Sequence, residues 1–139
     1  MKQLSEFILE SSRALENKRE FVIIKPGFLD KRNDIVEYLK NHNVIITAEL
    51  RKTLTLDEAR KIYKVHSKED FYKDLCNYMA SDDSIGLIMC NYGKYEMSDL
   101  KAELRKLYGI DEMKNAVHSS DSSKNVRRES KIYFGTPKF

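Results

Sequence analysis

The chain has 139 residues, a length that suits one domain able to bury a core without disulfides. Charged residues make up 34% and hydrophobic residues 41%, as in soluble globular proteins, and a net charge of only +3 does not demand a polyanionic partner. Cys76 and Cys90 lie far apart in apolar runs, which favours buried free thiols over a disulfide or metal site. No run reaches transmembrane length and no signal-peptide pattern opens the chain, so a cytoplasmic location without a membrane partner is expected.

The first predicted element is an amphipathic helix over Leu4–Leu15, whose apolar residues recur at close to helical spacing. This helix either docks on its own domain or contacts a neighbouring subunit. Phe21–Lys25 is a β-branched apolar run ended by Pro26 and Gly27, and it predicts a buried strand. Lys25, at the end of that strand, is either a ligand-binding charge or a solvated boundary residue.

The next four elements alternate between helix and strand. The pattern predicts a helix over Asp30–Asn41, a strand over Val44–Leu50, and two short helices over Leu56–Val65 and Lys68–Met79. The aromatic residues of the two short helices are consistent either with core packing or with a platform for a base.

Ser84–Cys90 is apolar throughout and therefore predicts a central strand. Apolar residues then recur at helical spacing over Met97–Tyr108, and Gly109 follows as a typical helix terminator. Arg105 lies on this helix. Its planar guanidinium suits a phosphate, although it is otherwise one of many exposed basic residues.

Asn115–Ser119 predicts the fourth strand and carries His118. The Ser120–Ser122 segment supplies strong N-capping residues, which predict a helix over Ser123–Lys131 with Glu129 about two turns in. A neutral imidazole is a good nucleophile or general base near pH 7, and a nearby carboxylate can orient it. From spacing alone, an ordinary histidine beside a capped helix explains the same pattern.

The order β-α-β-(α-α)-β-α-β-α places the chain in the mixed α/β class (α+β). It suits a ferredoxin-like sandwich, a four-stranded antiparallel sheet with helices on one face.

Several separated motifs between Phe21 and Phe134 resemble one enzyme family. The segment N-A-V-H-S-S-D-S followed by E-S-K-I-Y-F resembles the nucleoside diphosphate kinase signature N-x-x-H-G-S-D-S with a downstream E-x-x-x-x-F. The run Y-K-V-H-S-K-E-D-F-Y-K-D-L-C-N-Y-M resembles the helical hairpin of that family, and R-K-L-Y-G-I-D-E-M-K-N resembles its divergent short-loop branch. The family has the ferredoxin-like fold, with the hairpin inserted after the second strand.

This resemblance implies a ping-pong phosphotransferase that moves the γ-phosphate of a nucleoside triphosphate to a nucleoside diphosphate. His118 would be the nucleophile and would form a phosphohistidine, and Glu129, directly or through Ser120, would orient its ring. Arg105 would bind phosphate, with Lys101 provisionally replacing a second arginine of the family.

The resemblance also implies how the nucleotide would be held. Lys25 and Asn115 would bind the sugar hydroxyl region, and Tyr63 and Phe71 would form the base clamp, with Phe71 stacking on the base. Mg²⁺ would arrive with the nucleotide and bridge phosphate oxygens, so no residue is predicted as a metal ligand. The family core begins after the first helix, which implies an N-terminal helical extension over residues 1–19, a kinase-like domain over 20–139, and a homo-oligomer, a dimer or larger.

The chain departs from the family at three places. Ser119 stands where the family has glycine after the histidine, Gly27–Phe28 replaces its D-G, and the segment between Gly93 and Arg105 lacks most of a loop with a phosphate-binding threonine. These departures bear on phosphate affinity and on the usual hexamer. They support an alternative function, a catalytically weak or inactive nucleotide-binding or scaffold module. A third reading, nucleic-acid binding through the basic last helix, is less favoured than a solvated helix face.

Overall fold

The structure is a computed structural model that describes residues 19–135. The predicted helix over 4–15 and the tail beyond Gly135 lie outside the described residues. The strands are β1 (Arg19–Ile24), β2 (Val44–Lys52), β3 (Ser84–Asn91) and β4 (Val117–Ser119). The helices are α2 (Arg32–Asn41), α3 (Leu56–Ile62), α4 (Tyr72–Met79), α5 (Met97–Leu107) and α6 (Ser123–Phe134), with short 3₁₀ turns at Leu29–Lys31 and Lys64–His66.

The four strands form one sheet in the order β2-β3-β1-β4, and every neighbouring pair is antiparallel. This is the topology expected of the ferredoxin-like fold, so the predicted fold class is confirmed. The two central strands, β1 and β3, come from the two most apolar runs in the sequence, and all eight residues of β3 are buried.

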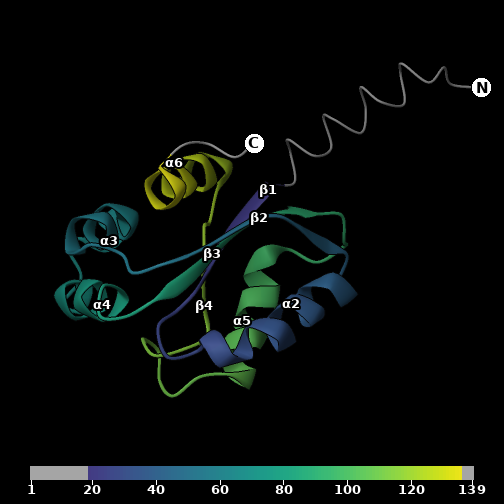
Figure 1. Cartoon of the computed structure of the whole chain (residues 1–139), viewed down its shortest axis with the longest axis horizontal. Helices are drawn as coiled ribbons and strands as arrows, with labels where there is room; N and C mark the ends of the chain where they lie inside the picture. The colour runs from purple at the N-terminus through teal and green to yellow at the C-terminus, as the bar shows by residue number, and fades with distance from the viewer. Residues whose placement is uncertain (1–18, 136–139) are drawn as a thin grey trace, which may run out of the picture.

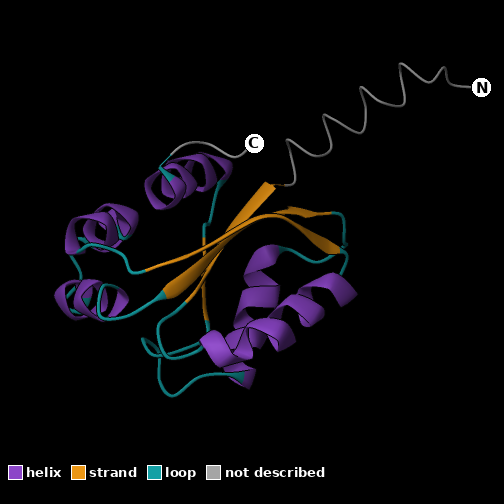
Figure 2. Cartoon of the chain, viewed as in Figure 1, coloured by secondary structure: helices purple, strands orange, loops and turns teal. Residues whose placement is uncertain are grey.

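Helices cover both faces of the sheet, whereas the sequence reading placed them on one face (Figures 1 and 2). Val22 and Ile24 of β1 pack into a core with α2 and α5, whereas Phe21 and Ile23 pack into a second core with α3, α4 and α6. The correction has a simple cause. A strand that is apolar at every position needs cover on both sides.

Some helix and strand bounds differ from the predictions. The helix predicted over 56–65 ends at Ile62, and the helix predicted over 68–79 begins only at Tyr72. The strand predicted over 115–119 begins at Val117, and the helix predicted to stop at Lys131 continues to Phe134. Phe71 consequently lies in the connection before α4 rather than inside a helix.

Tyr133 fixes α6 against the sheet. Its ring is fully buried, its hydroxyl lies 2.8 Å from Ser84 Oγ, and its ring centroid lies 5.8 Å from that of Phe21. The ring rests directly on Gly86 of β3, where an added Cβ would come within 2.5 Å of Tyr133 Cε1. Gly86 therefore allows the close approach of α6 to the sheet.

We expect Gly86→Ala to lower the free energy of unfolding by about 1–3 kcal/mol, because the new methyl group overpacks the Tyr133 ring. Thermal and urea unfolding measure this loss. The control is the same substitution in a Tyr133→Leu background, where the smaller side chain should absorb most of the cost. An equal cost in both backgrounds would contradict the explanation.

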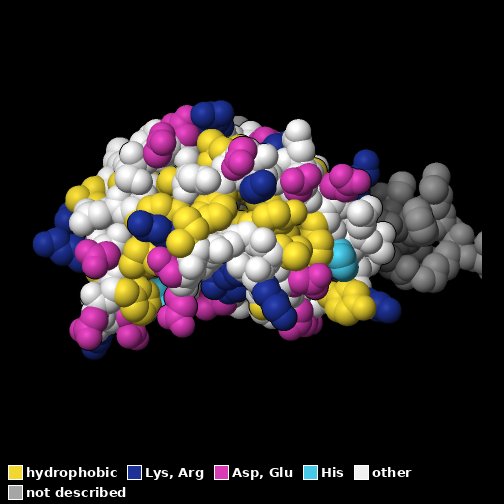
Figure 3. Space-filling view, turned by 90° about the horizontal axis from the view of Figure 1, so that it is seen from below, with side chains coloured by type: hydrophobic (Ala, Val, Ile, Leu, Met, Phe, Trp, Pro, Cys, Tyr) yellow, Lys and Arg dark blue, Asp and Glu magenta, His cyan; other side chains and the backbone are white. Residues whose placement is uncertain are grey.

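Within residues 19–135, no helix is long and apolar enough to cross a membrane. Figure 3 shows acidic and basic side chains intermixed around a band of hydrophobic side chains on the face seen from below. That face therefore presents no continuous basic surface of the kind that a nucleic acid requires.

Candidate active site

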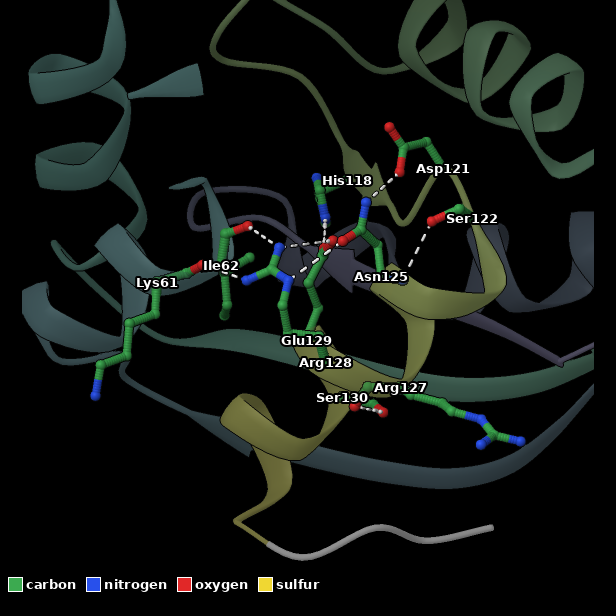
Figure 4. Close-up of polar contacts among 10 residues, drawn as sticks. All are labelled: Lys61, Ile62, His118, Asp121, Ser122, Asn125, Arg127, Arg128, Glu129 and Ser130. Atoms are coloured by element: carbon green, nitrogen blue, oxygen red, sulfur yellow. Dashed lines mark hydrogen bonds and ion pairs between the residues drawn. The ribbon is translucent and has the colours of Figure 1, made fainter. Parts of the chain in front are cut away.

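Strand β4 and helix α6 bring His118 and Glu129 together. β4 pairs with β1, so that His118 lies opposite Ile23, and Ser122 then caps α6 by accepting a hydrogen bond from the backbone N–H of Asn125 at 3.2 Å. Two turns into the helix, Glu129 Oε1 lies 2.5 Å from His118 Nε2 (Figure 4). Glu129 is only 2% exposed, so this carboxylate holds the imidazole in a largely dry environment.

A cavity of about 720 Å³ opens beside His118. Seven of the nine predicted site residues line it: Lys25, Tyr63, Phe71, Lys101, Arg105, His118 and Glu129. They come from α5, β4, α6, the position directly after β1 and the connections beside α3 and α4, so residues far apart in the sequence meet at one place. Its volume is within the usual range for small-molecule sites.

Three cationic side chains gather in this cavity. Lys25 is 2% exposed, and its Nζ donates to Asn115 Oδ1 at 2.9 Å and to the Met113 carbonyl at 3.2 Å. Burial, reinforced by the charges of Arg105 and Lys101, lowers the pKa of Lys25 to about 7. Arg105 donates from Nε to the Val117 carbonyl at 2.9 Å, which leaves its terminal nitrogens for a ligand. Uncompensated positive charge in a buried cavity favours an anionic ligand.

The imidazole of His118 favours its neutral form. Burial lowers its pKa below the usual 6.5, and the charges of Lys25 and Lys101 lower it further, although the hydrogen bond to Glu129 acts in the opposite direction. Because the carboxylate of Glu129 can only accept, Nε2 carries the hydrogen and Nδ1 keeps its lone pair. The geometry thus provides a neutral imidazole with one free nucleophilic nitrogen.

We expect an NMR titration of His118 to have its midpoint below pH 6.5. A lowered pKa means that the folded state binds fewer protons than the unfolded chain, so stability falls as the pH drops from 6.5 through the folded-state pKa. Lys101→Met is the matched test, because removing that charge should raise the midpoint. A midpoint above 6.5 in the unaltered chain would contradict this electrostatic account.

The two predicted aromatic residues are placed differently. Tyr63 is 3% exposed, and its ring lies edge-on to His118 with centroids 4.8 Å apart. Its hydroxyl is buried and has no hydrogen-bond partner among the described residues. Phe71 is 43% exposed at the cavity edge, where it contacts His66. Tyr63 is therefore both a packing residue and a wall of the cavity, whereas Phe71 offers an accessible ring face.

Ser120 and Asn115 are the two predicted residues that do not line this cavity. Glu129 contacts His118 directly, so a relay through Ser120 is wrong for this structure. The Ser120 hydroxyl is buried without a hydrogen-bond partner in the range 19–135, and the residue lines a separate, smaller hollow. Asn115 lies beneath Lys25, accepting from its ammonium and donating to the carbonyls of Asp111 and Glu112.

The sequence reading missed several residues around the cavity. Asp121 lines it, as does the loop containing Asp111 and Met113. Asp121 stands inside the quoted signature and could have been found there, whereas the loop is placed by contacts between distant segments, such as the hydrogen bond from Lys25 Nζ to the Met113 carbonyl. Arg128 was read as part of a solvated basic face, yet it contacts α3 and Glu129.

Comparison with known proteins identifies the family of the chain. The family model described as nucleoside diphosphate kinase matches residues 18–139. The chain belongs to the nucleoside diphosphate kinase family. Among its relatives, the nucleoside diphosphate kinase of Hyperthermus butylicus is 29% identical over 130 residues, covering 84% of this chain and 92% of that protein. That of Helicobacter acinonychis is 28% identical over 141 residues, covering 88% and 98%.

Solved structures of the nucleoside diphosphate kinase family share the fold. The Aquifex aeolicus nucleoside diphosphate kinase superposes with a TM-score of 0.72 at 23% identity, covering 84% of this chain and 94% of that one. The enzyme of Encephalitozoon cuniculi gives a TM-score of 0.70 at 20% identity, covering 85% and 89%. At these identities the likeness bears on the fold, and the site must be argued from its own residues.

Proposed function

We propose that the chain is a nucleoside diphosphate kinase, which transfers the γ-phosphate of a nucleoside triphosphate to a nucleoside diphosphate through a phosphohistidine at His118. One observation carries the proposal. A neutral imidazole, held through Nε2 by the buried carboxylate of Glu129, lines a cavity that also contains three cationic side chains. A phosphate would meet a free nucleophile and compensating charge in the same place.

In the first half-reaction, the Nδ1 lone pair of His118 attacks the γ-phosphorus. The P–N bond forms as the bond to the bridging oxygen breaks, and the nucleoside diphosphate leaves with that oxygen. The ring becomes positively charged, and the Glu129 carboxylate at Nε2 stabilises this charge. In the second half-reaction, a terminal oxygen of another diphosphate attacks the phosphorus. The new P–O bond forms as the P–N bond breaks, and the electron pair returns to Nδ1, which restores the neutral form of His118.

The remaining residues would bind and orient the nucleotide. Arg105, with its free terminal nitrogens, and Lys101 beside it would offset the phosphate charge, as phosphoryl transfer requires. Lys25, held by Asn115, would contact the sugar or phosphate oxygens. The exposed ring of Phe71 would stack on the base.

The donor set fits a Mg²⁺ ion that is carried by the nucleotide. Within residues 19–135, no group of three or more His, Cys, Asp or Glu side chains could hold a metal by itself. Asp121 lines the cavity, and one or two carboxylates with phosphates and water are the usual Mg²⁺ environment. Asp121 would therefore hold the ion through water, and the bound ion would neutralise charge on the phosphate oxygens.

The test is to incubate the purified chain with a γ-³²P-labelled nucleoside triphosphate and Mg²⁺. We expect an acid-labile, alkali-stable label on the protein, and its loss when unlabelled nucleoside diphosphate is added. An α-labelled triphosphate is the control, because it should leave no covalent label. An unlabelled protein after incubation with the γ-labelled nucleotide would refute the proposed activity.

A second candidate is a nucleotide-binding or scaffold module with little or no activity. Ser119 favours it, because this buried serine adds a side chain beside the nucleophile where the family has glycine. We expect the serine to slow the transfer without abolishing it. Tight nucleotide binding in calorimetry, without label on the protein, would favour the module instead.

The proposal extends to assembly, location and domain limits. Exposed Ile45, Tyr92 and Tyr95 support self-association into a dimer or larger homo-oligomer, which light scattering would measure. The free thiols of Cys76 and Cys90 support a reducing, cytoplasmic location. The family match from residue 18 supports an extension over residues 1–19 ahead of a domain over 20–139.

A further inference from the structure

Arg128, on helix α6, uses all three of its guanidinium nitrogens for hydrogen bonds (Figure 4). Nη1 donates to the Lys61 carbonyl at 2.5 Å and Nη2 donates to the Ile62 carbonyl at 3.2 Å. Nε donates to Asn125 Oδ1 at 3.2 Å. Lys61 and Ile62 end helix α3, so the guanidinium closes the carboxyl-terminal end of that helix, where a cation is favourable.

The same guanidinium is linked to both groups that contact His118, directly to Glu129 and through the end of α3 to Tyr63. Its Nη2 is 3.5 Å from Glu129 Oε2, and the other oxygen of this carboxylate binds the imidazole. The α3 end that it holds continues directly into Tyr63, whose ring lies edge-on to His118. One side chain therefore connects the carboxylate and the aromatic ring that surround the nucleophile.

We infer that Arg128 is a positioning residue, which fixes the orientation and tautomer of His118 by clamping Glu129 to the end of α3. The inference rests on the proposed phosphohistidine chemistry for its functional meaning. One oxygen of the Glu129 carboxylate accepts from the imidazole and the other forms an ion pair with the guanidinium at 3.5 Å, so both oxygens are engaged and the carboxylate has little freedom to rotate. Arginine is suited to this task, because its rigid planar fork can serve several acceptors at once, which a lysine ammonium on a flexible stem cannot do with the same geometry.

The contacts of Arg128 distinguish it from an ordinary surface ion pair. Its side chain is 30% exposed, but that of Glu129 is only 3% exposed, so the pair lies at the edge of the interior. Asn125 extends the network by donating from Nδ2 to Asp121 Oδ1 at 2.7 Å. The first turns of α6 thus link the cavity wall at Asp121 to the carboxylate behind His118.

Three variants test this inference. Arg128→Gln removes the charge and the fork, and Arg128→Lys keeps the charge but loses the fork. Arg127→Gln is the matched control, because the neighbouring arginine is exposed and its side chain points away from the network (Figure 4). Thermal unfolding of each variant distinguishes a variant that no longer folds from one that folds but no longer orients His118.

The decisive readout is ¹⁵N NMR of the His118 ring without nucleotide, which reports the tautomer independently of activity. We expect a single Nε2–H tautomer in the unaltered chain and in Arg127→Gln, and a mixture of tautomers in Arg128→Gln. The rate constant for protein phosphorylation should fall by about ten- to hundredfold in Arg128→Gln at saturating nucleotide. The KM for the nucleotide should stay within about twofold, because the substitution disturbs the alignment of His118 and not nucleotide binding. Arg128→Lys should lie between the two.

An unchanged tautomer and an unchanged rate in Arg128→Gln would overturn the inference. If Arg128→Gln does not fold, the test rests on Arg128→Lys. A tautomer and a rate in Arg128→Lys equal to those of the unaltered chain would then overturn the inference. Absence of label on the unaltered chain would refute the proposed kinase activity alone, because the tautomer measurement would still judge Arg128.

Discussion

His118→Ala is expected to abolish phosphorylation of the protein, lowering the rate on the order of 10⁴-fold or more, as when a covalent nucleophile is removed. Only His118 Nδ1 is proposed to attack phosphorus, because His118 is the cavity histidine that the Glu129 carboxylate holds, whereas His66 lies beside Phe71. Nucleotide affinity should change by less than about threefold, because Lys25, Arg105 and Phe71 are untouched. The measurements are acid-labile label per chain and nucleotide affinity by calorimetry.

His42→Ala is the control for this substitution. His42 lies in the turn after α2, where its Nδ1 contacts the Tyr38 carbonyl at 2.8 Å, and it does not line the cavity. It should keep the full label. Equal label on His118→Ala and on the unaltered chain would place the phosphate elsewhere and remove the basis of the mechanism.

Glu129→Gln is expected to slow phosphorylation by about ten- to hundredfold, which corresponds to the loss of about 1.5–3 kcal/mol for a hydrogen bond to a charged group. The amide keeps the shape of the side chain and can still accept a hydrogen bond from Nε2. It cannot stabilise the positive charge that develops on the ring, and it leaves Arg128 without its carboxylate. Single-turnover kinetics at saturating triphosphate measure the effect.

Glu37→Gln is the matched control for Glu129→Gln, since Glu37 is exposed on α2 and away from the cavity. We expect it to match the unaltered chain. If Glu129→Gln phosphorylates at a rate within twofold of the unaltered chain, the carboxylate does not support the transition state and serves packing alone.

The sequence was most informative for features that one local pattern determines, such as a strand, the start of a helix or a motif. The unbroken apolar run of β3 predicted a central strand, and the capping residues before α6 predicted its start at Ser123. The motif that contains His118 and the downstream Glu129 named the pair that the structure joins at 2.5 Å. The apolar run of β3 implies cover on both faces of the sheet, but strand periodicity describes burial and does not say which helices provide that cover.

The missed contacts depend on packing between distant segments. Arg128 meets the Lys61 carbonyl 67 positions away, and a basic residue on an amphipathic helix carries no sign of that partner. The sequence left open whether Glu129 orients His118 directly or through Ser120, and α6 packs closely enough for direct contact. Tyr133 resting on Gly86 sets that distance, and neither residue stands out in the sequence.

The two hydrogen bonds of Lys25 limit what it can do for a nucleotide. The Lys25 ammonium has three N–H groups, and Met113 and Asn115 accept from two of them. The third can therefore donate to a single ligand oxygen. Because its pKa is lowered to about 7, this nitrogen exchanges its third hydrogen for a lone pair near neutrality. A phosphate oxygen at the remaining position would favour the ammonium form, so that phosphate binding and protonation of Lys25 would be coupled.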